Sequence, residues 1–474
     1  VCVPLTAPSS NGVAVVRATA IQAEVSGTST GWPTGQTTVS FPGPLEVWVD
    51  DDYCSSCGND GHIWNYTAYD TIQGGVNGVL ANGTVHVLPG TYAESVTVAK
   101  RVSLLGSGAS SVLVVGTDAA GSRGFYVDRA DYVTISGFRI RDFETGIYLR
   151  GTGVGPGPRV LAATITNNVL ESNTTYGVRG SYVFTSTICS NDVTLGNNGI
   201  YLENSSYNTV CYNTVYNNLG VGIRLNTGNH NSFDNTHIYD LQNVGIELSG
   251  STLNNGIYGN HVHDVFWDGI LVNGGGGASV TVGTNTIANT NQGWLDGYGA
   301  APDANHNRGG LTLIGITSDS VVRLNRIAAA SNAEGNRTNS AGVYLFDCSI
   351  PITVESNLIE SNAGHGIYIS STLVVTAPLI HGNSIYSNAL FGLNNQLITR
   401  THAEGNWWGH NTVTVGPSTP RDVRSAASVW SSPPITVGLK AGPSTIPADG
   451  MATSAITATG QGGGYNILDG TLIT

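Results

Sequence analysis

Hydrophobic and polar positions along the chain repeat at a nearly fixed interval. A glycine is followed by an apolar residue, any residue and an aliphatic residue, and this phrase returns about eleven times. Clean copies follow one another from Gly124 to Gly146, from Gly222 to Gly245 and from Gly245 to Gly269. Short patches in which apolar and polar positions alternate predict β-strands, so the chain is expected to stack strands rather than helices.

A second phrase falls in the later part of each repeat and consists of an asparagine, one residue of any kind and an aliphatic residue. Asn213, Asn260 and Asn325 begin three of its copies. Asparagine and glycine tolerate the left-handed backbone of tight turns, whereas helical repeats avoid both residues. We therefore expect turns between the strands, with the turn asparagines of successive coils bonded to one another through their side-chain amides.

One coil for each copy of the glycine phrase, with several short strands in each coil, predicts an all-β parallel β-helix. Equivalent residues of neighbouring coils then lie about 4.8 Å apart. The handedness rule for parallel crossovers predicts a right-handed helix. One aliphatic position of the first phrase is expected to form a single buried column, which contains Ile200, Ile223, Ile246 and Ile270.

These repeats resemble the parallel β-helix repeat family of pectate-lyase-like extracellular proteins. The phrases that carry the resemblance are Gly-Ile-Tyr-Leu and Asn-x-Ile, and they cover roughly residues 45–410. The resemblance implies the fold, an extracellular or cell-surface location and a connection with carbohydrates. The motifs of polygalacturonases, pectate lyases and alginate epimerases are not found in the sequence, so no catalytic residue is assigned.

Composition shifts divide the chain into three expected parts. Residues 1–44 form an N-terminal extension, residues 45–430 the β-helix, and residues 431–474 a linker and a partial β-sandwich. An amphipathic stretch over residues 69–80 predicts a short helix that caps the open end of the solenoid, with Asp70 as its N-cap. The tail resembles the first strands of bacterial immunoglobulin-like domains of the invasin type, but it is too short for a whole sandwich.

Charge excludes two classes of partner. Charged residues make up 11% of the chain, and the net charge is −13. Nucleic acids and anionic membrane surfaces are bound by basic surfaces, so neither is an expected partner. The sequence has no apolar run long enough to span a bilayer as a helix, and we expect no membrane insertion. The start at Val1 is expected to follow removal of a signal peptide or trimming of the chain.

Six cysteines are present, and four of them fall into two pairs. Cys189 and Cys211 stand one repeat apart in matching contexts, so they should lie on adjacent coils within reach of a disulfide. The alternative is two buried thiols. Cys54 and Cys57 are expected to close a local loop. Disulfides favour an oxidising, extracytoplasmic environment.

Clustered acids, histidines and aromatic residues mark one candidate glycan-binding region, which includes part of an insertion at about residues 288–309. Aromatic rings suit sugar rings, and paired carboxylates would suit glycoside hydrolysis. The alternative is a set of solvated turn residues, since His237 and His261 occupy the same coil position one rung apart. The candidate residues are His261, His263, Asp264, Trp267, Asp268, Trp294, Asp296 and Tyr298.

Oxygen-bearing side chains near the N-terminal cap form a candidate cation site. Asp50, Asp52, Asn59 and Asp60 are the hard ligands that Ca²⁺ prefers, although their spacing is not that of an EF-hand. Solvated cap residues are the alternative, and no cofactor is otherwise expected.

Two classes of function remain open from the sequence. The first is a non-enzymatic, structural or adhesive surface protein, which polymerises head to tail into filaments through self-association. The second is a polysaccharide-active enzyme (a lyase, hydrolase or epimerase) or a glycan-binding module without chemistry, whose partner is a cell-surface or extracellular polysaccharide. A deep acidic groove would favour the enzyme, and a flat, regular face would favour the first class.

Overall fold

The structure is a computed structural model of the 474-residue chain. It describes residues 13–18, 35–40, 43–153, 159–275, 277–290, 309–331, 340–372, 376–397, 401–403, 405–409, 421–425, 436–442 and 455–461.

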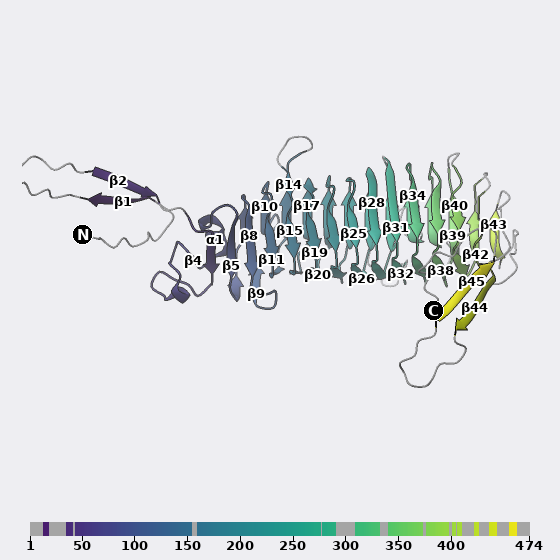
Figure 1. Ribbon diagram of the computed structural model, residues 1–474, viewed down its shortest axis with the longest axis horizontal. Coiled ribbons are helices and arrows are strands. Elements are labelled where there is room, and N and C mark those ends of the chain that lie inside the picture. Colours follow the sequence, from purple (N-terminus) through teal and green to yellow (C-terminus); the bar gives the residue numbers. More distant parts are fainter. Residues whose placement is uncertain are drawn as a thin grey trace, which may run out of the picture.

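Three long parallel sheets wind around one core to form the predicted β-helix (Figure 1). The 13-stranded sheet runs from β7 (Val96–Val98) to β43 (Arg421–Ser425). The 14-stranded sheet begins with β4 (Ala68–Tyr69) and β3 (Glu46–Val49), and the 12-stranded sheet begins with β6 (Gly90–Tyr92). Each coil contributes one strand to each sheet, so the outer face of a sheet presents columns of residues at intervals of one coil.

The predicted aliphatic column is confirmed. Ile200, Ile223, Ile246 and Ile270 are register partners on consecutive strands of the 13-stranded sheet, and each is fully buried. The glycine that precedes each of them is required by close packing between coils. A Cβ atom at Gly222 would lie 2.6 Å from the carbonyl oxygen of Gly245 on the next coil, which no side chain tolerates.

The predicted asparagine ladder is also confirmed. The Oδ1 atom of Asn285 accepts hydrogen bonds from the backbone and side-chain amides of Asn260, at 2.9 and 3.0 Å. Asn285 donates in turn to Asn325 Oδ1 at 3.0 Å. The same position holds a threonine, Thr236, on one coil, where Thr236 Oγ1 accepts only the backbone amide of Asn213 at 3.4 Å. Hydrogen bonds of the buried asparagine side chains therefore connect the turns of neighbouring coils.

A short helix lies at the N-terminal end of the stack, as predicted, but its boundaries differ from the prediction. The helix α1 spans Ile72–Gly78, and Thr71, not Asp70, is the N-cap residue, since the Thr71 side chain accepts a hydrogen bond from the amide of Gly74. Tyr69 belongs to β4 and Leu80 is 39% exposed, so neither lies in the helix. Strand pairing of β4 with β3 competes successfully with helix formation at residue 69.

Both predicted disulfides are present. Cys189 and Cys211 are register partners on adjacent coils, with Cα atoms 4.6 Å apart, and Cys54 is bonded to Cys57. The remaining described cysteine, Cys348, is a buried free thiol whose pKa is raised to about 11 by burial.

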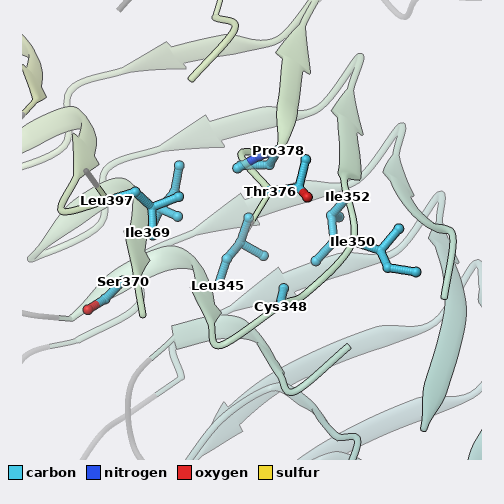
Figure 2. A pocket seen from close by; sticks show the side chains of 9 residues that line it. All are labelled: Leu345, Cys348, Ile350, Ile352, Ile369, Ser370, Thr376, Pro378 and Leu397. Atoms are coloured by element: carbon cyan, nitrogen blue, oxygen red, sulfur yellow. The ribbon is translucent and has the colours of Figure 1, made fainter. Parts of the chain in front are cut away.

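Cys348 lines a small apolar cavity in the C-terminal coils (Figure 2). Leu345, Ile352 and Leu397 are among the other residues around it. The cavity has room for about one water-sized sphere, and polar groups to hold a water are scarce in its lining. A cavity of this size is too small for a ligand larger than water.

Two antiparallel strand pairs lie outside the three sheets. Strands β1 (Val13–Ala18) and β2 (Gly35–Ser40) form one pair, and β44 (Thr436–Gly442) and β45 (Ala455–Gln461) form the other. The tail therefore contains β-structure, while its immunoglobulin-like character and the three domain boundaries remain predictions. No helix among the described residues is long and apolar enough to cross a membrane.

Candidate functional site

Three of the predicted glycan-binding residues lie together on the outer face of the 12-stranded sheet. His261, His263 and Asp264 belong to strand β29 (His261–Val265). Val262 between the two histidines is fully buried in the core, so strand alternation turns both histidines outward. Asp264 follows with a left-handed backbone (φ 52°), which bends the chain and brings its carboxylate to the His263 ring.

His237, on strand β26 (His237–Leu241), completes a cluster of three imidazoles. Its ring stacks on that of His261 with centroids 5.0 Å apart and planes 4° apart, which confirms that the two occupy the same coil position. The Nε2 atom of His237 lies 2.8 Å from Nε2 of His263. The Nδ1 atom of His263 lies 2.6 Å from the Asp264 carboxylate. We call His237, His261 and His263 the histidine cluster.

The environments of His237 and His261 favour neutral imidazoles. Partial burial lowers the pKa of His237, and the neighbouring His263 lowers it further. Burial, His263 and His237 lower the pKa of His261 in the same way. Since the ordinary histidine pKa is about 6.5, both rings are neutral at pH 7 and each carries one nitrogen lone pair.

Trp267 and Asp268 do not join the histidine cluster. Trp267 is partly buried against an apolar group that includes Val244 and Leu271 of the neighbouring sheet. Asp268 is fully buried, and its Oδ1 atom accepts hydrogen bonds from the backbone amide of Gly309 at 2.9 Å and from Thr312 Oγ1 at 2.5 Å. Asp268 thus anchors the chain where it returns from the insertion. Trp294, Asp296 and Tyr298 lie outside the described residues.

The candidate cation site is only partly assembled. The carboxylates of Asp50 and Asp52 lie within 4.8 Å of one another and of Asp51, which the sequence analysis did not include. Burial raises the pKa of Asp50, and repulsion by the neighbouring carboxylates adds to it. Asn59 is buried and uses its amide on the backbone of Cys54, and Asp60 accepts a hydrogen bond from the Tyr53 hydroxyl. Calcium binding here remains a prediction.

A second polar face, which the sequence analysis missed, lies on the 13-stranded sheet. One outward column follows six consecutive strands, and its residues are register partners from each strand to the next. We call this column the tyrosine–arginine face. Its residues are Tyr126, Tyr148, Arg179, Tyr201, Arg224 and Glu247. The strands are β10 (Arg123–Asp128), β13 (Thr145–Arg150), β17 (Tyr176–Ser181), β21 (Asn198–Glu203), β24 (Ile223–Asn226) and β27 (Ile246–Ser249).

Cations and rings on the tyrosine–arginine face contact one another. The guanidinium of Arg179 lies 4.9 Å from the centre of the Tyr148 ring, and that of Arg123 lies 4.4 Å from the centre of the Tyr126 ring. The guanidinium of Arg224 lies 6.0 Å from the Tyr201 ring centre. These cation–π contacts orient the rings and hold the long arginine side chains against the sheet.

Carboxylates on or beside the tyrosine–arginine face are held in ion pairs. Arg179 contacts Glu203 at 3.0 Å, and Arg224 contacts Glu247 at 3.2 Å. Asp128 pairs with Arg150 at 3.3 Å and with Arg129, and the hydrogen bond from Arg129 lowers the pKa of the Asp128 carboxyl. The face is therefore rich in oriented donors and acceptors, and its three carboxylates pair with four arginines on or beside it.

The open part of this column ends at Arg224 on β24, because Glu247 on the next strand is buried, with 6% of its surface exposed. The register partner of Glu247 is Leu271, which is fully buried, and the next partners include Thr312, Tyr344 and Tyr368, which are also buried. By contrast, Tyr126, Tyr148 and Tyr201 and the two arginines of the column are partly exposed. An accessible ligand surface on the column is thus limited to the coils from β10 to β24.

The sequence did contain a signal for this face. The third residue of the repeated glycine phrase occupies the outward position of its strand. In the six copies between residues 124 and 248, this residue is Tyr, Tyr, Arg, Tyr, Arg and Glu in turn. Arginines are concentrated in the same region, with eight of them between residues 123 and 224 against seven carboxylates, in a chain whose net charge is −13.

Comparisons with known proteins agree with the fold. Residues 123–291 match a family model described as "Right handed beta helix region". The A-module of mannuronan C-5 epimerase AlgE6 from Azotobacter vinelandii is similar in structure, with a TM-score of 0.50 and 17% identity over 77% of this chain and 94% of that one. No curated protein sequence matches the chain.

Two further solved structures are similar at lower scores. DFA-IIIase from Arthrobacter chlorophenolicus A6 has a TM-score of 0.45 and 13% identity, over 65% of this chain and 85% of that one. Tailspike protein 2 of Escherichia coli O157:H7 bacteriophage CAB120 has a TM-score of 0.44 and 15% identity, over 60% of this chain and 40% of that one. At these identities the likeness concerns the fold alone. With its stacked coils and three parallel sheets, and with residues 123–291 matching the family model, the chain has the fold of a right-handed parallel β-helix.

Proposed function

We propose that the protein binds a polysaccharide along the tyrosine–arginine face. The observation that carries the proposal is the partly exposed column of aromatic rings and ion-paired arginines over five coils, from Tyr126 to Arg224. A sugar ring has an apolar face that packs on an aromatic ring, and its hydroxyls take hydrogen bonds from oriented charged groups. A column that repeats at every coil suits an extended polymer better than a single small molecule.

Binding without cleavage is the form of this function that we favour. A glycosidase needs one carboxyl group with a raised pKa to act as general acid. The Asp128 carboxyl has a lowered pKa because Arg129 donates to it, and Glu203 and Glu247 are held by arginines. The likeness to a mannuronan epimerase module agrees with a carbohydrate ligand, but at 17% identity it does not carry the proposal.

The ion pairs of the face favour hydroxyl recognition over attraction to a polyanion. Each of Asp128, Glu203 and Glu247 already neutralises an arginine. We therefore expect the affinity for the polysaccharide to change little between low and physiological salt, because few counterions are released. An extracellular location is part of the proposal and is supported by the two disulfides.

The test is a binding screen of the full chain against immobilised neutral and acidic polysaccharides at two salt concentrations. The expected result is binding to at least one neutral polysaccharide with little salt dependence. Binding that is confined to acidic polymers and lost at high salt would contradict hydroxyl recognition. No binding across the panel would contradict the proposed function.

Self-association through the terminal strand pairs remains a second proposal. Strands β44 and β45 form a two-stranded sheet. A two-stranded sheet is marginally stable on its own, and each of its strands leaves one edge unpaired. Such edges pair with further strands, which the other copies of the chain can supply. This proposal concerns assembly and is independent of polysaccharide binding.

A further inference from the structure

The histidine cluster lies on a different sheet from the tyrosine–arginine face and is not used by the proposed function. We propose that His237, His261 and His263 form a binding site for one divalent transition-metal ion, and that Zn²⁺ is the preferred occupant. Two neighbouring coils would contribute the ligands, since His237 comes from β26 and the other two histidines come from β29.

The distances suit one ion after small side-chain rotations. One ring nitrogen of each histidine lies within 4.8 Å of the other two, and the His237 and His263 Nε2 atoms are 2.8 Å apart. Tetrahedral Zn²⁺ with bonds of about 2.0–2.1 Å places its nitrogen ligands about 3.3 Å apart. The close pair must open by about 0.5 Å for a bond of this length, which rotation of the χ angles allows on an outer face.

Asp264 supplies the second element of a metal site. Its carboxylate, 2.6 Å from His263 Nδ1, accepts a hydrogen bond from Nδ1–H, so the lone pair of the neutral ring lies on Nε2. Histidines that bind metals are commonly oriented in this way by a carboxylate, which also raises their basicity. The Nε2 lone pair of His263 points toward His237, whose Nε2 atom is its present hydrogen-bond partner. His237 Nε2–H donates that hydrogen bond, so metal binding requires the His237 proton to move to Nδ1 and replaces the hydrogen bond by two coordination bonds.

The surroundings leave room for an ion. Strand β32 (Thr286–Ala288) is the neighbour of β29, and the register partners of His261 and His263 are Thr286 and Ala288, whose side chains are small. On the other side, the Tyr239 ring stacks on His263 with centroids 5.3 Å apart and holds the ring upright. Three protein ligands leave a fourth position open for water or an external ligand.

The choice of metal follows from the ligand type. Three imidazoles suit Zn²⁺, Cu²⁺ and Ni²⁺, whereas Ca²⁺ and Mg²⁺ prefer oxygen ligands. The alternative is that the histidine cluster is only a hydrogen-bonded stack, in which His237 Nε2–H donates to His263 Nε2. The two accounts predict different results when Zn²⁺ is added: a metal site binds one ion, whereas a hydrogen-bonded stack binds none.

The test uses the full chain, freed of metal with a chelator and then titrated with Zn²⁺ by calorimetry and with Co²⁺ by visible absorption. The expected result is one equivalent of Zn²⁺ per chain, with a Co²⁺ spectrum typical of four-coordinate geometry. His261→Gln should weaken Zn²⁺ binding at least about 100-fold because one of three ligands is lost. Asp264→Asn should weaken it by about 10- to 100-fold because the carboxylate orients a ligand.

His230→Asn is the matched control. His230 is an exposed histidine with a left-handed backbone, stacked on Tyr207 outside the cluster, and asparagine tolerates that conformation. The control should bind Zn²⁺ as the unaltered protein does, and circular dichroism should show every variant folded. The absence of stoichiometric Zn²⁺ binding, or equal affinity in His261→Gln and His230→Asn, would overturn the proposal.

Discussion

The asparagine ladder permits a quantitative prediction for Asn285. This side chain is 1% exposed and takes part in five side-chain hydrogen bonds that join three coils. Asn285→Ala removes the acceptor of the backbone amide of Asn260 and leaves that amide buried without a partner. An orphaned buried donor costs about 1–3 kcal/mol, and the other lost bonds contribute about 0.5–1.5 kcal/mol each where no second partner remains. We expect a loss of about 3–6 kcal/mol in the free energy of unfolding.

The assay is equilibrium unfolding in urea followed by far-UV circular dichroism, with the midpoint compared at an unchanged m-value. Asn273→Ala is the matched control, because Asn273 lies partly exposed on the neighbouring strand β30 (Ile270–Asn273). Asn273→Ala should change the free energy of unfolding by no more than about 0.5 kcal/mol. Thr236→Asn should fill the one interrupted rung and raise stability by about 0.5–1.5 kcal/mol. If Asn285→Ala and Asn273→Ala unfold at the same midpoint, the ladder does not stabilise the coils as argued.

Three further predictions concern the core, the thiol and the tail. Ile223→Asp should cost several kcal/mol, since it buries an unpaired charge, and an unchanged Tm would show that the register is wrong. With its pKa near 11, Cys348 should resist iodoacetamide at pH 8, react about tenfold faster per pH unit up to pH 11, and react at once in urea. The neutral thiol is favoured by the fold, so its contribution to stability falls as pH rises above about 8.5, and fast alkylation at pH 8 without urea would contradict its burial. Deletion of residues 435–474 should leave a folded β-helix that sediments as a monomer; a truncated chain that still polymerises would rule out strand exchange through the tail.

Local rules were sufficient to predict the fold but not the exact elements at its ends. The glycine and asparagine phrases predicted the buried column at Ile223 and the ladder at Asn260, because each coil repeats the same contacts. Residue 69 was predicted to be helical and is paired in β4, since strand pairing with β3 depends on tertiary contacts. Leu80 fits the apolar face of a helix in the sequence, yet the chain leaves the helix before it.

The candidate site was harder to predict because it depends on which columns are outward and open. His261, His263 and Asp264 do lie together, but Asp268, only a few positions after Asp264, is buried as a loop anchor. The role of His237 required the register between β26 and β29. The repeat period predicts which residues of successive coils lie above one another. Whether such a residue is exposed depends on what covers the sheet at that point, because Leu271 and Tyr344 occupy outward positions and are nevertheless buried.

The central claim is that the tyrosine–arginine face binds a polysaccharide, and the most direct measurement is calorimetry with a ligand from the screen. The double variant Tyr148→Ala/Tyr201→Ala removes two rings of the face. Tyr216→Ala/Tyr239→Ala is the matched control, because it also removes two partly exposed tyrosine rings, which stack 5.2 Å apart on the 12-stranded sheet. Each lost ring should cost about 1–2 kcal/mol, so the first variant should bind at least about tenfold more weakly while the control binds as the unaltered protein does. Equal affinity in both variants, or a loss confined to the control, would contradict the claim.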